Sequence, residues 1–275
     1  MNIRAYGLCP VVLLSLFLSV IGAPSAELLV KKTGTGTIIG YKDTPMLPGT
    51  GGKYHIHDPD RPAPKPVTPG RPSAEKRAGS APSDAIVLFD GDDLAAWRPS
   101  SWKVQDGYVE IGPGSLETKQ PFGDCQVHVE WMSPTVVADH LMSRGNSGVL
   151  LMGRYEIQIF DSFPGHADHI YPDGQAASLY GQTPPLVNAC RRPGEWQSFD
   201  IVFTAPEFKD GKVSRRGVVT MFHNGVLVHL NEAIAGPMAH REIAPYEAHA
   251  AKLPLVLQGH GSPVRFRNIW IRPLD

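Results

Sequence analysis

The stretch "GRYEIQIFD", residues 153–161, has the alternation of a β-strand that serves two different surfaces. Successive side chains of an extended chain point to opposite faces, so Ile157 and Ile159 share one face while Glu156 and Gln158 share the other. The apolar face predicts a strand that packs on a core. The other face carries a carboxylate and an amide, which are groups that bind hydroxyls, and we therefore treat it as a candidate site.

The same alternation of apolar and polar residues continues from residue 84 onward, in short runs that are separated by turn residues. Asp106-Gly107 and Asn224-Gly225 suit the positive φ of two-residue hairpin turns. The predicted strands cover residues 85–89, 102–112, 125–132, 147–153, 155–161, 196–205, 217–231, 253–260 and 264–274. Many short strands at regular spacing predict an all-β sandwich or barrel.

Two more strands repeat the polar face of the opening stretch. In "CQVHVEWM" (125–132) the face of Glu130 is polar, and in "LPLVLQGH" (253–260) Gln258 and His260 share a face. If these faces coincide, acids, amides and imidazoles from separate strands meet in one concave hollow. The alternative is a solvated outer face, which is normal for an antiparallel sheet.

The N-terminal segment has a different composition from the rest. Residues 1–26 combine an early positive charge, an apolar run and small residues, and they are identified as a secretory signal peptide. The run is shorter than the roughly 20 residues of a spanning helix, so no transmembrane anchor is expected unless the signal is retained. Residues 27–83 are rich in Pro and Gly and predict an irregular arm or linker, followed by the domain at 84–275.

Overall charge and cysteine content narrow the function classes further. The formal net charge is -1, so the protein has no strong positive electrostatic field that would attract nucleic acid or anionic lipid. Binding to polyanions is therefore not expected. Of the three cysteines, Cys9 leaves with the signal, while Cys125 and Cys190 enter a secreted or periplasmic compartment that permits disulfides. Either a single bridge or two separate buried thiols fits the sequence.

Several motifs, in order, carry a resemblance to a known family. These are "LFDGDDLAAW" (88–97), "RGNSGVLL" (144–151), "GRYEIQIFDS" (153–162), "SLYGQTPPLVNACRRPGEWQSFDIVF" (178–203), "VTMFHNGVLV" (219–228) and "LQGHGSPVRFRNIWIRPL" (257–274). Together they resemble the 3-keto-disaccharide hydrolase domain family. The resemblance implies an all-β fold of the concanavalin A-like lectin/glucanase type, a jelly-roll sandwich of two antiparallel sheets. It also implies the cleavage of glycosides whose sugar is already oxidised to a ketone at carbon 3.

A conventional glycosidase is the alternative within enzymes, and the spacing of acids argues against it. Such enzymes need two carboxyls about 5 to 5.5 Å or 6.5 to 9.5 Å apart. Glu156 and Gln158 are roughly 6.6 Å apart along a strand, but Gln158 is an amide. Asp161 is roughly 16 Å from Glu156 in a straight strand, and on the opposite face without a bulge.

A ketone at carbon 3 acidifies the proton on carbon 2 and allows elimination of the leaving group at carbon 1, so one base suffices. The candidates for that base are Glu156 and His260, and Glu130 is the candidate acid for the leaving oxygen. The candidates for holding hydroxyls or the developing oxyanion are Asn146, Gln158, Gln258, Arg144, Asp161 and Arg267.

Cofactors and partners follow from the same chemistry. The His, Glu and Asp residues on these faces would suit calcium or zinc, although no tight ligand motif is present. The expected substrate is an oxidised, 3-keto disaccharide or glycoside, and an upstream sugar oxidoreductase would have to supply it. A non-catalytic carbohydrate-binding module that uses the same hollow is the alternative outside enzymes.

Overall fold

The computed structural model describes residues 27–33, 36–46, 51–62, 73–74, 76–136, 143–168 and 170–274. The predicted signal peptide, residues 1–26, lies outside the described residues. The chain divides into two compact units, residues 1–66 and 67–275. The second unit therefore includes the end of the predicted arm as well as the predicted domain.

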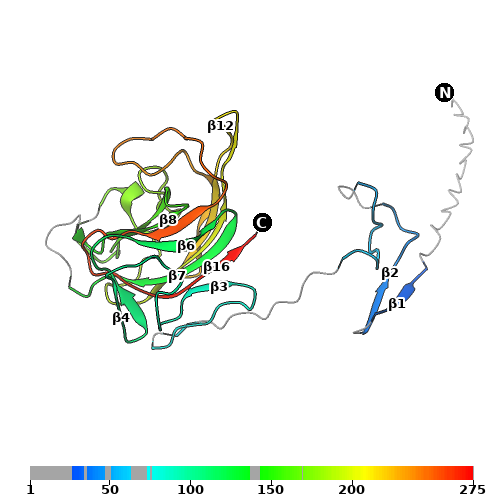
Figure 1. The fold of residues 1–275 in the computed structure, drawn as a ribbon, viewed down its shortest axis with the longest axis horizontal. Coiled ribbons are helices and arrows are strands. Elements are labelled where there is room, and N and C mark those ends of the chain that lie inside the picture. The colour runs from blue at the N-terminus through cyan, green and yellow to red at the C-terminus, as the bar shows by residue number, and fades with distance from the viewer. Residues whose placement is uncertain are drawn as a thin grey trace, which may run out of the picture. The chain divides into compact units, whose positions relative to one another are not determined.

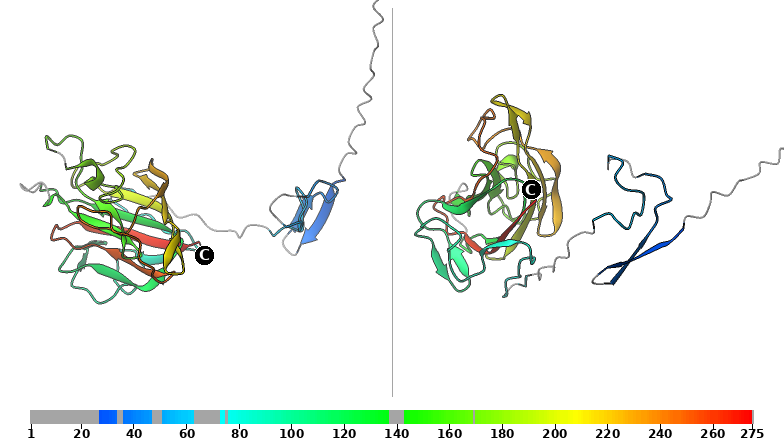
Figure 2. Two further views of the ribbon diagram at one scale, coloured as in Figure 1. Left: turned by 90° about the horizontal axis from the view of Figure 1, so that it is seen from above. Right: turned by 45° about the vertical axis from the view of Figure 1, so that its right-hand side comes forward.

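The second unit is an all-β sandwich of antiparallel sheets, as the sequence predicted, and its layers are visible in Figures 1 and 2. The large sheet has the order β14-β13-β10-β7-β16-β5-β4, with β3 also on β16. Its strands are β3 (Ile86–Phe89), β4 (Lys103–Gln105), β5 (Tyr108–Glu110), β7 (Cys125–Met132), β10 (Gln197–Thr204), β13 (Val218–His223), β14 (Val226–Ala233) and β16 (Arg265–Pro273).

The small sheet has the order β6-β15-β8-β9. Its strands are β6 (Leu116–Phe122), β15 (Leu253–Leu257), β8 (Ser147–Leu151) and β9 (Tyr155–Ile159). A separate ribbon pairs β11 (Glu207–Lys209) with β12 (Lys212–Arg215). Residues Pro172–Gly174 form the short 3-10 helix η2, and no α-helix is found in the part of the chain that the structure describes.

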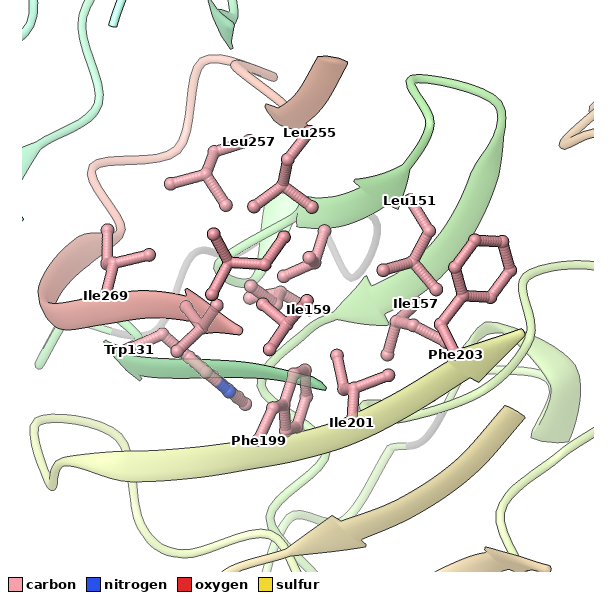
Figure 3. Close-up of a cluster of buried hydrophobic side chains, with 14 of the residues drawn as sticks. Trp131, Leu151, Ile157, Ile159, Phe199, Ile201, Phe203, Leu255, Leu257 and Ile269 are labelled. Carbon is pink, nitrogen blue, oxygen red and sulfur yellow. The ribbon is translucent and has the colours of Figure 1, made fainter. Parts of the chain in front are cut away.

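The core lies between the two sheets, and the opening stretch supplies part of it. Ile157 and Ile159 of β9 are fully buried and lie across from Phe199 and Ile201 of β10 (Figure 3). Trp131 of β7 is also fully buried, because it shares the core-facing side of the strand with Val127 and Val129. Burial of this apolar surface, at about 25 cal/mol per Å², is the main force that holds the sheets together.

The hairpin predictions are confirmed by backbone geometry. Asp106 and Gly107 join β4 to β5 with φ of 49° and 76°, and Asn224 and Gly225 join β13 to β14 with φ of 52° and 78°. These left-handed values fit a two-residue turn, which favours Asn, Asp and Gly. Sequence patterning missed β6, where the pattern is broken by Lys119, Gln120 and Pro121.

The description of the arm as irregular is wrong for its first part. Residues Leu29–Thr33 (β1) and Gly36–Gly40 (β2) form an antiparallel pair, which their threonines and β-branched residues favour. Lys31 and Lys42 both bind Asp60 within this first unit. In the second unit, residues Ser73 and Ala74 contact side chains of the large sheet.

The expectation that the polar faces of β7 and β9 coincide is wrong. β7 belongs to the large sheet and β9 to the small sheet, and each strand turns its apolar residues toward the shared core. Alternation then sends the side chains of Glu130 and Glu156 out of opposite faces of the sandwich. Strand parity predicted the outward direction of each side chain, but it contained no information on which sheet each strand joins.

Two further features of the described residues concern membrane-spanning helices and cysteines. No helix among them is long and apolar enough to cross a membrane. Cys125 and Cys190 are both buried, and no disulfide joins them, so the alternative of two separate thiols holds. Burial raises the pKa of Cys190 to about 11, which keeps this thiol protonated and unreactive near neutral pH.

Candidate functional site

The outer face of the small sheet is built around Glu156 of β9. On one side β9 pairs with β8, and on the other side it pairs with residues 177–180. Tyr180 donates its backbone N–H to the Glu156 carbonyl at 3.1 Å, and the Gln158 N–H donates to the Ser178 carbonyl at 2.9 Å. Because Leu179 between them is buried in the core, Ser178 and Tyr180 project on the same face as Glu156 and Gln158.

Gly148 of β8 makes room for the Glu156 carboxylate. A Cβ atom at Gly148 would collide with Glu156 Oε1, so the carboxylate lies directly over this glycine. Leu150 is the register partner of Glu156, and Gly148 is the register partner of Gln158. Any side chain at position 148 would displace the carboxylate. The glycine in "RGNSGVLL" is therefore explained by this close approach.

The Glu156 side chain is buried, and no described group donates a hydrogen bond to its carboxylate or forms an ion pair with it. The residue is 5% exposed, and no hydrogen bond or ion pair to its carboxylate is found among the described residues. Burial in low dielectric penalises the ionised form, and this raises the pKa of Glu156 to about 8. A carboxylate with a pKa near neutral pH and no competing partner has the properties of a general acid or base.

Gln158 and Asn146 lie next to this carboxylate as hydrogen-bonding groups. Gln158 Nε2 donates to Asn146 Oδ1 at 3.2 Å, which fixes the orientation of both amides. Gln158 is 2% exposed, and its Oε1 atom is buried without a partner among the described residues. An unsatisfied buried acceptor is costly, and a bound hydroxyl would satisfy it.

Tyr180 is a member of this face that sequence reasoning did not select. Its hydroxyl is within 3.1 Å of the Tyr171 hydroxyl and 3.0 Å of His240 Nδ1. Burial raises the pKa of Tyr180 above its ordinary value, and the neighbouring Tyr171 and the charge of Glu156 raise it further. The phenol therefore stays protonated and can donate. The signal was its place two residues after Ser178 in the motif "SLYGQ".

Two other residues predicted on this face, Gln258 and His260, differ in whether strand pairing places their side chains there. Gln258 continues the pairing of β15, since its backbone N–H donates to the Gly148 carbonyl at 2.9 Å, and its half-buried side chain shares the face of Val256. His260 is exposed and lies beyond the end of β15 at Leu257, so strand parity does not place its side chain on this face. The structure does not join His260 to Glu156 by a hydrogen bond or ion pair.

Arg144 and Asp161 flank the end of β9. The Asp161 N–H donates to the Arg144 carbonyl at 2.9 Å, and Arg144 Nη1 donates to the Asp168 carbonyl at 3.1 Å. Asp161 is 4% exposed, and its carboxylate lies 2.8 Å from His166 Nε2. Asp161 is therefore engaged by His166, whereas the carboxylate of Glu156 is not engaged by any described group.

Glu130 and Arg267 lie on the outer face of the large sheet, in a different environment. Arg267 Nε donates to Glu130 Oε2 at 2.6 Å, and both side chains are almost fully buried. Asn268 Nδ2 donates to Glu130 Oε1 at 2.6 Å, and the Ser73 hydroxyl donates to the same oxygen. Arg267 is thus held by a structural ion pair on the face opposite Glu156.

Protonation states follow from these contacts. Burial alone would raise the pKa of Glu130, but the donors His128, Ser73, Asn268 and Arg267 lower it to about 2. Burial alone would lower the pKa of His128, but Asp200, 2.6 Å from its Nδ1 atom, and Glu130 raise it to about 9. A carboxylate that is permanently ionised and fully paired is a weak base, and for this reason Glu130 lacks the chemical properties that Glu156 has.

The described residues offer no clustered set of metal ligands. Among the described residues, no group of three or more His, Cys, Asp or Glu side chains is arranged to hold a metal ion. The calcium or zinc that the sequence suggested therefore stays a prediction without an identified ligand set.

The outer face of the small sheet thus brings a buried acid, two amides and a phenol together. The family model of the 3-keto-alpha-glucoside-1,2-lyase-like domain, the 3-keto-disaccharide hydrolase domain, matches residues 84–272. The chain belongs to this family, as its motifs predicted.

Comparison with solved structures agrees with this assignment. A crystal structure of a candidate glycosyl hydrolase from Parabacteroides distasonis ATCC 8503 is 40% identical, covers 78% of this chain and 93% of its own, and has a TM-score of 0.70. Two other candidate glycosyl hydrolases from that organism show the same fold, at 20% and 22% identity and TM-scores of 0.51 and 0.53, over 70% and 69% of this chain and 94% and 99% of their own. The comparison with curated proteins finds no match.

Proposed function

We propose that this domain cleaves 3-keto-glycosides by elimination at carbons 1 and 2, with Glu156 as the base. The observation that carries the proposal is the buried Glu156 carboxylate with a pKa of about 8 and no described partner. At pH 7 about one-tenth of such a group is ionised and can accept a proton, and it is not held by an ion pair as Glu130 is. The family description and the 40% identical candidate glycosyl hydrolase support the substrate class.

The reaction would proceed in balanced steps. Glu156 removes the proton from carbon 2, and the electron pair of that C–H bond forms an enolate with the ketone at carbon 3. The enolate collapses, a C1=C2 double bond forms, and the C1–O bond to the leaving group breaks. The phenol of Tyr180 supplies the proton that the leaving oxygen needs. Water then adds to carbon 1 and a proton returns to carbon 2, which gives the free 3-keto sugar.

Amides on the same face would hold the substrate during these steps. Gln158 and Asn146 are fixed by their mutual hydrogen bond, so they are preorganised to bind the hydroxyls or the developing enolate oxygen. Preorganised dipoles stabilise the charge at no cost of reorientation. Gln258 lies on the adjacent part of this face and is assigned to the same role.

The direct test is turnover of paired disaccharides, one oxidised to the 3-ketone and one unoxidised, by Glu156→Gln. We expect kcat/KM on the keto-disaccharide to fall about 1000-fold, the range of a lost general base, while the protein stays folded. The matched control is Glu117→Gln, an exposed acid of the same sheet that pairs with Arg98 and should leave turnover unchanged. Unchanged turnover in Glu156→Gln would remove this residue from the mechanism.

The same pair of substrates separates the alternative functions. Cleavage of the unoxidised disaccharide would identify a conventional glycosidase. Binding of either sugar without release of products would identify a lectin-like module. We also propose that the protein is secreted or periplasmic and that a sugar oxidoreductase supplies its ketone, and sequencing of the mature N-terminus would test the first of these statements.

A further inference from the structure

A cavity of about 770 Å³ lies on the outer face of the large sheet, on the side of the sandwich opposite Glu156. Its floor comes from β7, β10 and β16, and part of its wall is formed by Ser73, Ala74, Ser80 and Pro82. The volume is within the range of about 300 to 1,000 Å³ that small-molecule sites occupy. The two sheets and the whole core separate this cavity from the face of Glu156. It is therefore a separate site.

The floor of the cavity is rigid because its polar groups bind one another. Glu130 receives hydrogen bonds from Arg267 and Asn268, both at 2.6 Å, and Arg267 Nη2 donates to the Ala74 carbonyl at 3.0 Å. His128 lies between Asp200 and Glu130. Groups held in this way keep their positions before a ligand arrives, which lowers the entropy lost on binding.

Aromatic rings form the other part of the lining. The Trp196 ring is half-buried, and one of its faces is covered by the Arg267 guanidinium, 4.2 Å from the ring centroid. Trp270 is stacked on His128 with centroids 5.2 Å apart and 11° between the planes. Flat apolar surfaces beside fixed hydrogen-bonding groups suit a ligand with both C–H faces and hydroxyls.

The charges of the lining are balanced, which narrows the ligand class. The cationic residues are Arg191, Arg267 and His128, and the anionic residues are Glu130, Glu195 and Asp200. Three of each sign leave no net field to attract a polyanion or a cation. Asp200 is partly exposed, with 39% of its side chain accessible, so it can accept hydrogen bonds from a ligand.

We propose that this cavity is a second, non-catalytic binding site for a neutral carbohydrate, a mono- or disaccharide unit stacked on Trp196 with its hydroxyls on Asp200 and Asn268. The proposal goes beyond the reaction assigned to Glu156 and does not depend on it. A second site of this kind would hold the protein on a glycan while the opposite face acts on released, oxidised sugars.

The test is calorimetric titration of the full chain carrying Glu156→Gln with maltose, cellobiose and trehalose, each recovered intact afterwards. We expect at least one of these sugars to bind, and Trp196→Ala to weaken its affinity about tenfold or more. Trp196→Phe, which retains a ring, should recover most of the affinity.

A second pair of variants distinguishes a blocked cavity from a misfolded protein. Ser198 lines the cavity from β10, and Ser198→Phe fills the space without deleting a floor contact. It should abolish binding, while Ser198→Thr should retain it, with melting temperatures measured for both. The proposal is overturned if none of the three sugars binds, if Trp196→Ala and Ser198→Phe bind like their parent, or if Gln158→Ala removes all binding. Turnover of the keto-disaccharide tests Glu156 separately, so the two proposals can fail independently.

Discussion

The two outer faces of this sandwich carry similar residue types but opposite electrostatics. On the large sheet, Glu130 is surrounded by donors, and its pKa falls to about 2. On the small sheet, Glu156 is equally buried but has no donor among the described residues, and its pKa rises to about 8. The difference shows that hydrogen-bonding partners, and not burial alone, decide whether a buried acid can exchange a proton near neutral pH. Glu130 stabilises structure, and Glu156 is available for chemistry.

The largest expected effect concerns the paired acid. Glu130→Ala leaves the buried Arg267 guanidinium without its carboxylate, and we expect the free energy of unfolding to fall by about 3 to 5 kcal/mol. Denaturant titration measures this loss. The control is Glu110→Ala, which removes an acid paired with the partly exposed Arg265 and should cost no more than about 1 kcal/mol. Equal losses for both variants would contradict the account of the large-sheet face.

The unpaired acid should show the opposite effect on stability. Glu156 ionises near pH 4.5 in the unfolded chain and near pH 8 in the folded protein, so the folded state retains a proton that the unfolded state loses. Wild-type stability therefore falls as pH rises from about 4.5 to 8. Glu156→Gln cannot titrate, and we expect it to be more stable than wild type at pH 9, by roughly 3 to 5 kcal/mol, but not at pH 4. Thermal melts across this range measure the difference, and a gap that does not depend on pH would show that Glu156 keeps its ordinary pKa.

Displacement of the same carboxylate should reduce activity. Gly148→Ala places a methyl group where Glu156 Oε1 lies, and we expect kcat/KM on a 3-keto-disaccharide to fall about 100-fold, as misplacement by about 1 Å can do. If the glycine acts only through Glu156, the Gly148→Ala/Glu156→Gln double variant will be no worse than Glu156→Gln alone. Additive losses would show that the glycine has a separate role.

The smallest expected effect is the pH dependence of the wild type. A base acts in its ionised form, so kcat/KM should rise with pH and level off above the pKa of Glu156, near 8. Between pH 7 and 9 the rise should be about tenfold. Steady-state rates on the keto-disaccharide measure it, after correction for the reaction without enzyme. A flat profile through this range would indicate that another group limits the reaction.

Sequence patterns predicted the strands of the second unit well, because alternation and turn chemistry are local properties. β7 begins and ends at Cys125 and Met132 as predicted, and both Asx-Gly hairpins are present. The patterns could not predict which strands share a sheet, since that depends on pairing between residues far apart in the chain. Glu130 was therefore assigned to the wrong face.

The site was predicted in part for the same reason. Glu156, Gln158 and Asn146 lie together because they come from two strands joined by a short hairpin, β8 and β9. Tyr180 was missed because residues 177–180 pair with β9 through isolated backbone bonds and carry no strand pattern of their own. Apart from His128, two positions away, the partners that lower the pKa of Glu130 come from residues 57 to 138 positions away, which no local pattern encodes.

The exchange of hydrogen at carbon 2 gives the most direct test of the assignment of Glu156. In D₂O, wild type should release a 3-keto sugar that carries deuterium at carbon 2, above the level formed without enzyme, since elimination breaks that C–H bond and hydration restores it from solvent. We expect Glu117→Gln to retain this incorporation and Glu156→Gln to lose it. Incorporation by Glu156→Gln at the wild-type rate, or wild-type release of sugar without deuterium, would contradict the account.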